Sequence, residues 1–274
     1  MSPLVTAAEL HDLIGRVTLL DVRYQLGGPP GVAAYIEGHI PSAVYVDLDS
    51  SLAGTPGSAG RHPLPDAGSF GEVMRRVGVS GERPVVVYDD WQGRAAARCW
   101  WLLRHHGHPD VRVLDGGFSA WVAAGGAVDD GMQLPLTVGD FEPGPGSLQP
   151  LAAEDVPAFV EAGVLVDARN SDRFRGEVEP VDPVAGHIPG AVNVPTTTNL
   201  RADGTFRSPA EIAALYAVEG VTTDAEVGVY CGSGVTATHD VLALAVAGID
   251  ARLYPGSWSE WVADPARPVA TGPA

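Results

Sequence analysis

Cysteine is nearly absent from this chain of 274 residues, which contains only Cys99 and Cys231. Two cysteines are too few for a disulfide framework, so the fold must rest on a hydrophobic core. A hydrophobic content of 45% is enough to form one. Because Cys99 lies in the helix-like run AAARCWWLLRHH, we expect it to be buried and inert. Cys231 is the cysteine left to carry chemistry, and the alternative is a second buried thiol that packs as a small hydrophobe.

Basic residues are also few, since 17 Lys and Arg stand against 34 Asp and Glu and give a formal net charge of −17. Nucleic acids and anionic membrane surfaces bind clustered Lys and Arg, so we expect neither as a partner. A membrane-spanning helix needs about 20 apolar residues, and no apolar run of this chain approaches that length. The first ten residues also lack the basic region of a signal peptide. The sequence therefore predicts a cytoplasmic protein that meets any anionic substrate with local charge.

What the chain does contain is an internal repeat. The repeated pairs are LDVR 20–23 with VDAR 166–169, GHIPSAV 38–44 with GHIPGAV 186–192, VVVYD 85–89 with VGVYC 227–231, and GGFSAW 116–121 with GSWSEW 256–261. Two copies of one domain explain these pairs. We expect an N-terminal domain at 1–130, a Pro- and Gly-rich linker at 131–150 and a C-terminal domain at 151–274.

Within each copy, short β-branched runs alternate with helix-like stretches, which predicts an α/β fold with a mostly parallel sheet and helices on both faces. Functional loops in such sheets follow the carboxyl ends of strands. Cys231 lies at such an end, between the strand-like run 227–230 and the helix-like run 238–247. Amide N–H groups converge at a helix start and lower a cysteine pKa, so we expect a reactive thiolate. Its counterpart Asp89 is a poor nucleophile, which predicts one active and one supporting domain.

A cysteine beside a loop of N–H donors fits phosphate-ester cleavage or sulfur transfer. Cysteine phosphatases close this loop with an arginine six residues after the cysteine, where this chain has Ala237. A Cys-His-Asp hydrolase needs a nearby base, and His239 lies inside the following helix-like run. Both hydrolytic activities are therefore disfavoured.

The doubled LDVR and GHIPGA motifs, the YCGSGVTA loop and the terminal GSWSEW resemble the tandem-domain rhodanese sulfurtransferases over nearly the whole chain. The loop is most similar to that of the 3-mercaptopyruvate branch. This resemblance implies that Cys231 takes a sulfane sulfur from a donor and holds it as a persulfide. It then delivers the sulfur to cyanide or to a thiol, which could belong to a thioredoxin-like protein. A persulfide carries negative charge, so a cradle of amides suits it.

The resemblance also assigns site residues. Arg173 matches the arginine that binds the anionic end of the donor, and Ser233 matches the loop serine of the mercaptopyruvate branch. Asp49 and His62 match an aspartate and a histidine which that branch brings across the domain interface to relay a proton as pyruvate leaves. The remaining residues expected to line the substrate site are Gly232, Gly234, Val235 and Thr236. We expect no cofactor and no metal.

The donor is less sharply specified. Thiosulfate is a dianion, and its branch places basic residues just after the cysteine, whereas Gly232 and Ser233 are neutral and favour mercaptopyruvate. The mercaptopyruvate branch carries a second carboxylate-binding arginine after its Glu-Pro segment, where this chain has Val181 and Asp182. We therefore favour 3-mercaptopyruvate and keep two alternatives open: thiosulfate, and a persulfide carrier that loads from a partner enzyme without turnover.

Several other polar residues have plainer interpretations. His39 and His187 recur in both copies although only one copy has a cysteine, so we expect them to brace turns. Asp167 is expected to orient the loop or Arg169, and Trp258 to belong mostly to the core. The cluster of histidines at 105–108 lacks matching Cys or carboxylate ligands, which predicts a solvated helix end.

Overall fold

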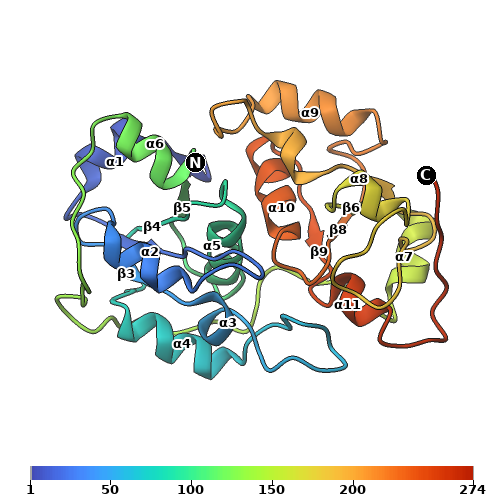
Figure 1. Cartoon of the computed structure of the whole chain (residues 1–274), viewed down its shortest axis with the longest axis horizontal. Helices are drawn as coiled ribbons and strands as arrows, with labels where there is room; N and C mark the ends of the chain where they lie inside the picture. Colours follow the sequence, from blue (N-terminus) through green and yellow to red (C-terminus); the bar gives the residue numbers. More distant parts are fainter. Residues whose placement is uncertain (1, 274) are drawn as a thin grey trace. The chain divides into compact units, whose positions relative to one another are not determined.

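The computed structural model describes residues 2–273, which form two compact units (Figure 1). The first unit consists of the residues up to Gly54, with 65–148 and 202–206, and the second consists of 55–64, 149–201 and 207 onward. These units differ from the expected domains in three places. Residues 55–64 belong with the second repeat, residues 202–206 with the first, and most of the expected linker with the first. The last difference arises because this stretch packs on the first unit, where the Phe141 N–H donates to the Val79 carbonyl at 3.2 Å.

The first unit contains a five-stranded parallel sheet in the order β1-β5-β4-β2-β3. Its strands are β1 (Leu4–Val5), β2 (Thr18–Asp21), β3 (Val44–Tyr45), β4 (Val85–Tyr88) and β5 (Val111–Leu114). Its helices are α1 (Ala7–Leu13), α2 (Gly31–Glu37), α3 (Leu48–Ser51), α4 (Ala67–Arg76), α5 (Arg94–His105) and α6 (Gly117–Ala123). Strands β2 and β4 are buried at every position, as expected for continuous apolar runs in a covered parallel sheet.

The second unit contains a four-stranded parallel sheet in the order β7-β6-β8-β9. Its strands are β6 (Val164–Asp167), β7 (Val192–Asn193), β8 (Val227–Tyr230) and β9 (Arg252–Leu253). Its helices are α7 (Val156–Ala162), α8 (Ser171–Phe174), the 3-10 helix η1 (Thr196–Asn199), α9 (Pro209–Ala217), α10 (Ala237–Val246) and α11 (Ser257–Trp261). Figure 1 shows α10 alongside β8 and β9. The prediction of two α/β domains with parallel sheets is confirmed.

The two sheets end in the same way at their functional edge. Asp21 at the end of β2 pairs with Tyr88 at the end of β4, and Asp167 at the end of β6 pairs with Tyr230 at the end of β8. The next residue after β4 is Asp89 and the next after β8 is Cys231. The fold therefore places both residues at equivalent carboxyl ends of central strands, where parallel sheets carry their functional loops.

The repeated histidines brace the turns of the GHIP motif. The His39 ring lies 4.2 Å from the Tyr35 ring, and its Nδ1 is 3.0 Å from the Tyr35 carbonyl oxygen. In the second unit the His187 ring lies 3.8 Å from the Phe174 ring, and its Nδ1 is 2.7 Å from the Phe174 carbonyl oxygen. Both side chains are buried, so their predicted structural role is confirmed.

Within residues 2–273, none of the helices combines the length and the apolar character that crossing a membrane requires.

Candidate active site

The backbone of Cys231 is fixed from α11. Cys231 is 1% exposed, and its N–H donates to Ser257 Oγ at 3.1 Å. Its carbonyl oxygen accepts the Trp258 N–H at 2.9 Å, and the Gly232 carbonyl oxygen accepts the Ser259 N–H at 2.9 Å. Three hydrogen bonds from the start of one helix therefore set the position of the thiol.

Ser257 adopts a backbone conformation that side chains disfavour. Its φ is 54°, in the left-handed region that favours glycine, and the equivalent residue of the first unit is Gly117, with φ 60°. The buried Ser257 hydroxyl accepts the Cys231 N–H and donates to the Tyr254 carbonyl at 2.9 Å. Glycine could not accept the Cys231 N–H, which is a reason for serine at this strained position. The sequence analysis missed Ser257, although the alignment of GGF 116–118 with GSW 256–258 contained the signal.

The loop after Cys231 turns sharply at Gly234. With φ at 76°, a Cβ atom there would lie 2.1 Å from the Pro255 carbonyl oxygen, so only glycine fits. Val235 is buried, Thr236 is the residue before α10, and the Thr238 N–H returns to the Val235 carbonyl at 3.2 Å. The chain from Cys231 to Thr236 therefore curls in front of the N-terminus of α10.

Ser233 and His62 lie together in the second unit. His62 Nδ1 is 2.8 Å from Ser233 Oγ, and both side chains are buried. A short segment, residues 55–64, carries His62 to this position, and we call it the strap. Asp49, the other residue expected to join this relay, lies in α3 of the first unit with an exposed side chain. Its role stays a prediction.

Arg173 is held by two acidic residues. Its Nε and Nη2 donate to Glu179 at 3.2 and 2.6 Å, and Nη2 also lies 3.5 Å from Asp182 Oδ2. Glu179 also accepts the N–H groups of Val181 at 3.0 Å and Asp182 at 3.1 Å. Burial by itself raises the pKa of Glu179, but the hydrogen bonds from Arg173 and these amides outweigh it and lower that pKa below its ordinary value. Glu179 therefore stays charged and anchors Arg173.

A second guanidinium, that of Arg61 on the strap, reaches the same loop. Arg61 forms an ion pair with Asp182, whose side chain is 3% exposed. A Cβ atom built on Gly232 would lie 3.1 Å from Arg61 Nη2 and 3.7 Å from Arg173 Nη1. Two arginines therefore face the residue next to Cys231. Sequence reasoning missed Arg61, for which the only signal was a basic residue directly before His62.

Asp167 and Arg169 form a buried pair beneath this cluster. The Arg169 N–H and Nε donate to Asp167 Oδ1 at 2.9 and 3.0 Å, and Nη2 donates to Oδ2 at 2.6 Å. The guanidinium lies 4.7 Å from the ring centre of Trp258, which is fully buried and donates its Nε1–H to the Val184 carbonyl. Asp167 thus orients Arg169, and Trp258 belongs to the core.

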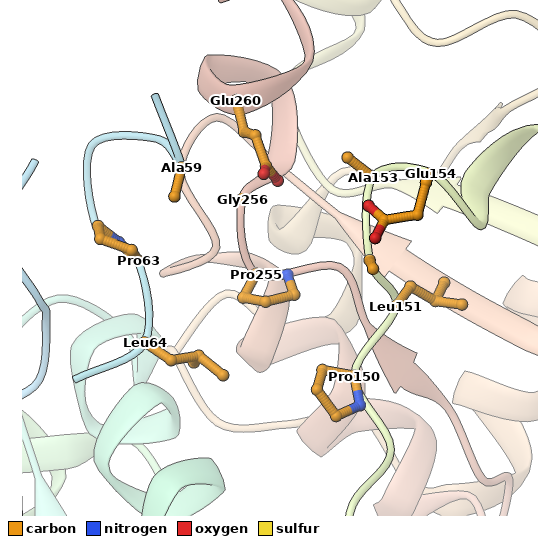
Figure 2. A pocket seen from close by; sticks show the side chains of 11 residues that line it. Ala59, Pro63, Leu64, Pro150, Leu151, Ala153, Glu154, Pro255, Gly256 and Glu260 are labelled. Carbon is orange, nitrogen blue, oxygen red and sulfur yellow. The ribbon is translucent and has the colours of Figure 1, made fainter. Parts of the chain in front are cut away.

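The strap also borders a pocket of about 270 Å³ (Figure 2). Ala59, Pro63 and Leu64 face residues 150–154 and the Pro255–Gly256 turn across it. The strap therefore presents Ala59 and Pro63 to this pocket, while Arg61 and His62 contact the second unit's Asp182 and Ser233.

Comparison with known proteins agrees with this geometry. The family model of the rhodanese-like domain matches the chain twice, at residues 6–124 and 152–264. The chain therefore belongs to the rhodanese family, as a tandem of two such domains. Within this family the chain is a sulfurtransferase, because its relatives are named as sulfurtransferases.

A Mycobacterium tuberculosis protein, SseB, which is provisionally named a thiosulfate sulfurtransferase, is 49% identical over 99% of this chain and 98% of its own length. The human 3-mercaptopyruvate sulfurtransferase is 37% identical over 89% of this chain and 84% of its own length. The crystal structure of SseA from Escherichia coli, a 3-mercaptopyruvate sulfurtransferase, superimposes with a TM-score of 0.84 at 32% identity, covering 94% of this chain and all of that one. These relatives agree on the enzyme class and carry names with two different donors.

Proposed function

We propose that this sulfurtransferase takes the sulfane sulfur of 3-mercaptopyruvate onto Cys231 and passes it to a thiol or to cyanide. The observation that carries the choice of donor is the 2.8 Å contact between His62 Nδ1 and Ser233 Oγ, in the same loop as the thiol. Transfer from mercaptopyruvate requires a proton to move, and a buried serine and histidine in contact are suited to move it.

The proton requirement follows from the bonds that change. The Cys231 thiolate attacks the sulfur of mercaptopyruvate, and a Cys–S–SH group forms as the donor's C–S bond breaks. The electron pair of that bond stays on carbon and gives the enolate of pyruvate. Protonation of this enolate completes pyruvate, and ionisation of the persulfide supplies an equivalent proton. Ser233 and His62 are the groups we assign to this transfer.

The second half-reaction restores the enzyme. An acceptor thiolate attacks the outer sulfur of the persulfide, the S–S bond breaks, and its electron pair returns to Cys231 as a thiolate. The acceptor leaves carrying the sulfur. We include a thioredoxin-like protein among the thiol acceptors, and we propose that the enzyme acts in the cytoplasm.

Thiosulfate is the second candidate donor, and two guanidinium groups beside Gly232 favour it. In that reaction the thiolate attacks the outer sulfur, the S–S bond breaks, and sulfite leaves with the electron pair. No proton moves in this step. The two donors therefore make different demands on the contact between Ser233 and His62, and the carboxylates of Glu179 and Asp182 beside the arginines disfavour a dianion.

The test measures persulfide formation and turnover separately. Mass spectrometry after incubation with each donor should show a gain of one sulfur on Cys231, and kcat/KM should be higher for mercaptopyruvate than for thiosulfate. A Cys231 that stays unmodified with both donors contradicts a sulfurtransferase mechanism at this residue. Loading without steady-state turnover would instead identify a persulfide carrier.

A further inference from the structure

Arg61 lies beside Gly232, in the loop that follows Cys231, and no family motif assigned it to the site. The mercaptopyruvate branch carries a second carboxylate-binding arginine after its Glu-Pro segment, and this chain has Val181 and Asp182 there. We propose that Arg61, from the strap, is the second arginine that binds the carboxylate of the donor. This inference rests on the proposed function and names a specificity-determining residue within the same site.

Arg61 lies as close to the loop after Cys231 as Arg173 does. Arg61 Nη2 lies 3.1 Å from where a Cβ atom of Gly232 would be, whereas the nearest Arg173 nitrogens lie 3.7 Å from it. Gly232 directly follows Cys231 in the chain. Arg61 therefore approaches the loop of the nucleophile at least as closely as the arginine that the family resemblance identifies.

The two guanidinium groups differ in which edge the protein's own carboxylates already take. A carboxylate binds an arginine best through two parallel N–H bonds. Glu179 already takes Nε and Nη2 of Arg173, which is one complete edge. Asp182 takes only Nη1 of Arg61. Arg61 Nε is buried and has no hydrogen-bond partner among residues 2–273. The Nε–Nη2 edge of Arg61 is therefore the edge that has no acceptor among the described residues, and we assign the donor carboxylate to it.

Hydrogen bonds and close packing of the strap hold Arg61 in place. The Arg61 N–H donates to Ser259 Oγ at 3.1 Å, and Gly57 and Gly60 exchange two backbone hydrogen bonds of 3.0 Å. Gly60 has φ 101°, and a Cβ atom there would lie 2.8 Å from the Gly256 carbonyl oxygen. The strap thus packs closely against the start of α11, the helix that also fixes Cys231. A guanidinium held in this way loses less side-chain entropy when it binds its ligand.

Asp182 explains how this charge is tolerated without a donor. Its carboxylate contacts both Arg61 and Arg173 and is nearly fully buried. Both guanidinium groups are partly buried, and a carboxylate beside them offsets the cost of removing their charge from water. The chain thus has no arginine at 181 or 182, after its Glu-Pro segment, whereas Arg61 on the strap is held at the site by Asp182.

The decisive experiment compares steady-state kinetics of Arg61→Gln with those of the wild type, using 3-mercaptopyruvate. Loss of a charged hydrogen bond should raise KM by about 10-fold or more while kcat changes little. Arg201→Gln is the matched control, because Arg201 is an exposed arginine of the same unit whose ion pair is with Glu211. An unchanged KM for Arg61→Gln would overturn the proposal.

A rescue variant separates substrate binding from a merely structural role. Arg61→Gln combined with Val181→Arg places an arginine directly after the Glu-Pro segment, where the mercaptopyruvate branch carries one, and it should lower KM again. If Arg61→Gln does not fold, Arg61→Lys keeps the charge without the fork and should still raise KM. A KM equal to that of the wild type in Arg61→Lys, at unchanged melting temperature, would then count against Arg61.

A binding measurement keeps this proposal distinct from the proposed function. Calorimetry with pyruvate, the carboxylate product, should show weaker binding to Cys231→Ser/Arg61→Gln than to Cys231→Ser alone. Equal binding overturns the role of Arg61 even when wild-type Cys231 gains sulfur normally. A wild-type Cys231 that gains no sulfur from either donor overturns the proposed function instead.

Discussion

The loops after β4 and β8 are equivalent segments of the internal repeat, but the first begins with the carboxylate of Asp89 and the second with the thiol of Cys231. The Asp89 carboxylate accepts the N–H groups of Trp91, Gly93, Ala95 and Ala96 at 2.8 to 2.9 Å. Burial raises the pKa of Asp89, and these amide hydrogen bonds act against that rise. In the first unit, the four amide groups of this loop therefore bind the carboxylate of Asp89, and we call these groups the ring of amides and Asp89 its internal anion. Its loop shows that this turn gathers N–H donors around the side chain of its first residue.

The second loop keeps part of that turn. Gln92 and its counterpart Gly234 both have left-handed backbones, with φ 60° and 76°. Gly93 is also left-handed, at φ 83°, whereas the β-branched Val235 at the equivalent position stands outside that region. The Thr238 N–H, equivalent to that of Ala96, bonds to the Val235 carbonyl instead of to the residue after β8. The second loop is thus less closed around its first residue, which suits the proposed acceptance and release of sulfur by Cys231.

Removing the thiol of the second loop should have the largest effect on activity. Cys231→Ser should reduce transfer to background, because a hydroxyl cannot carry a sulfane sulfur. Persulfide formation measured by mass spectrometry checks this directly. The matched control is Cys99→Ala, since Cys99 is fully buried in α5 and burial raises the pKa of its thiol. Appreciable transfer by Cys231→Ser would move the chemistry to another residue.

Removing the internal anion should destabilise the first unit. Asp89→Ala leaves four amides without their acceptor, and each buried donor left unsatisfied costs about 1 to 3 kcal/mol. We expect the free energy of unfolding to fall by at least about 4 kcal/mol. Chemical denaturation measures this change, and Asp90→Ala, at the exposed neighbouring residue, is the control. Equal stability of the two variants would show that the ring of amides does not need its anion.

The contact between Ser233 and His62 has no role in a purely anionic transfer, so it should distinguish the two donors. His62→Gln should slow turnover with mercaptopyruvate by about 10²-fold or more, the usual contribution of a general acid or base. Turnover with thiosulfate should change much less, because sulfite leaves without a proton. Parallel kcat measurements with both donors check the difference. Equal losses would argue that His62 only supports the loop.

Substitution of Arg173 should weaken donor binding, because it removes a positive charge that we assign to the donor's anionic end. Arg173→Ala should raise KM for mercaptopyruvate by about 10- to 100-fold, corresponding to a charged hydrogen bond of about 1.5 to 3 kcal/mol. Arg175→Ala is the control two residues away, since Arg175 is exposed and pairs with Glu177. Initial rates over a range of donor concentrations separate KM from kcat. Unchanged kinetics in Arg173→Ala would remove this residue from the donor site.

Much of the fold could be predicted because the repeat and the strand periodicity are local properties of the chain. Continuous apolar runs such as 85–88 and 227–230 indicated buried parallel strands, and the duplicated motifs indicated two domains. The unit boundaries were harder to predict because they depend on packing. Nothing in the composition of residues 55–64 shows that this segment, which precedes α4 of the first unit, belongs with the second.

The residue types and their order predicted Cys231 as the reactive cysteine and identified Asp89 as its counterpart, since they decide which chemistry is available. The motifs also assigned Ser233, His62 and Arg173. Packing of the chain brought Arg61 beside Gly232 and Ser257 beside the Cys231 amide. Arg61 reaches Gly232 from 171 positions earlier in the chain through the fold of the strap, and Ser257 reaches the Cys231 amide through a backbone angle that sequence pattern does not reveal. Long-range contacts and backbone strain arise when the chain packs, and residue type alone does not specify them.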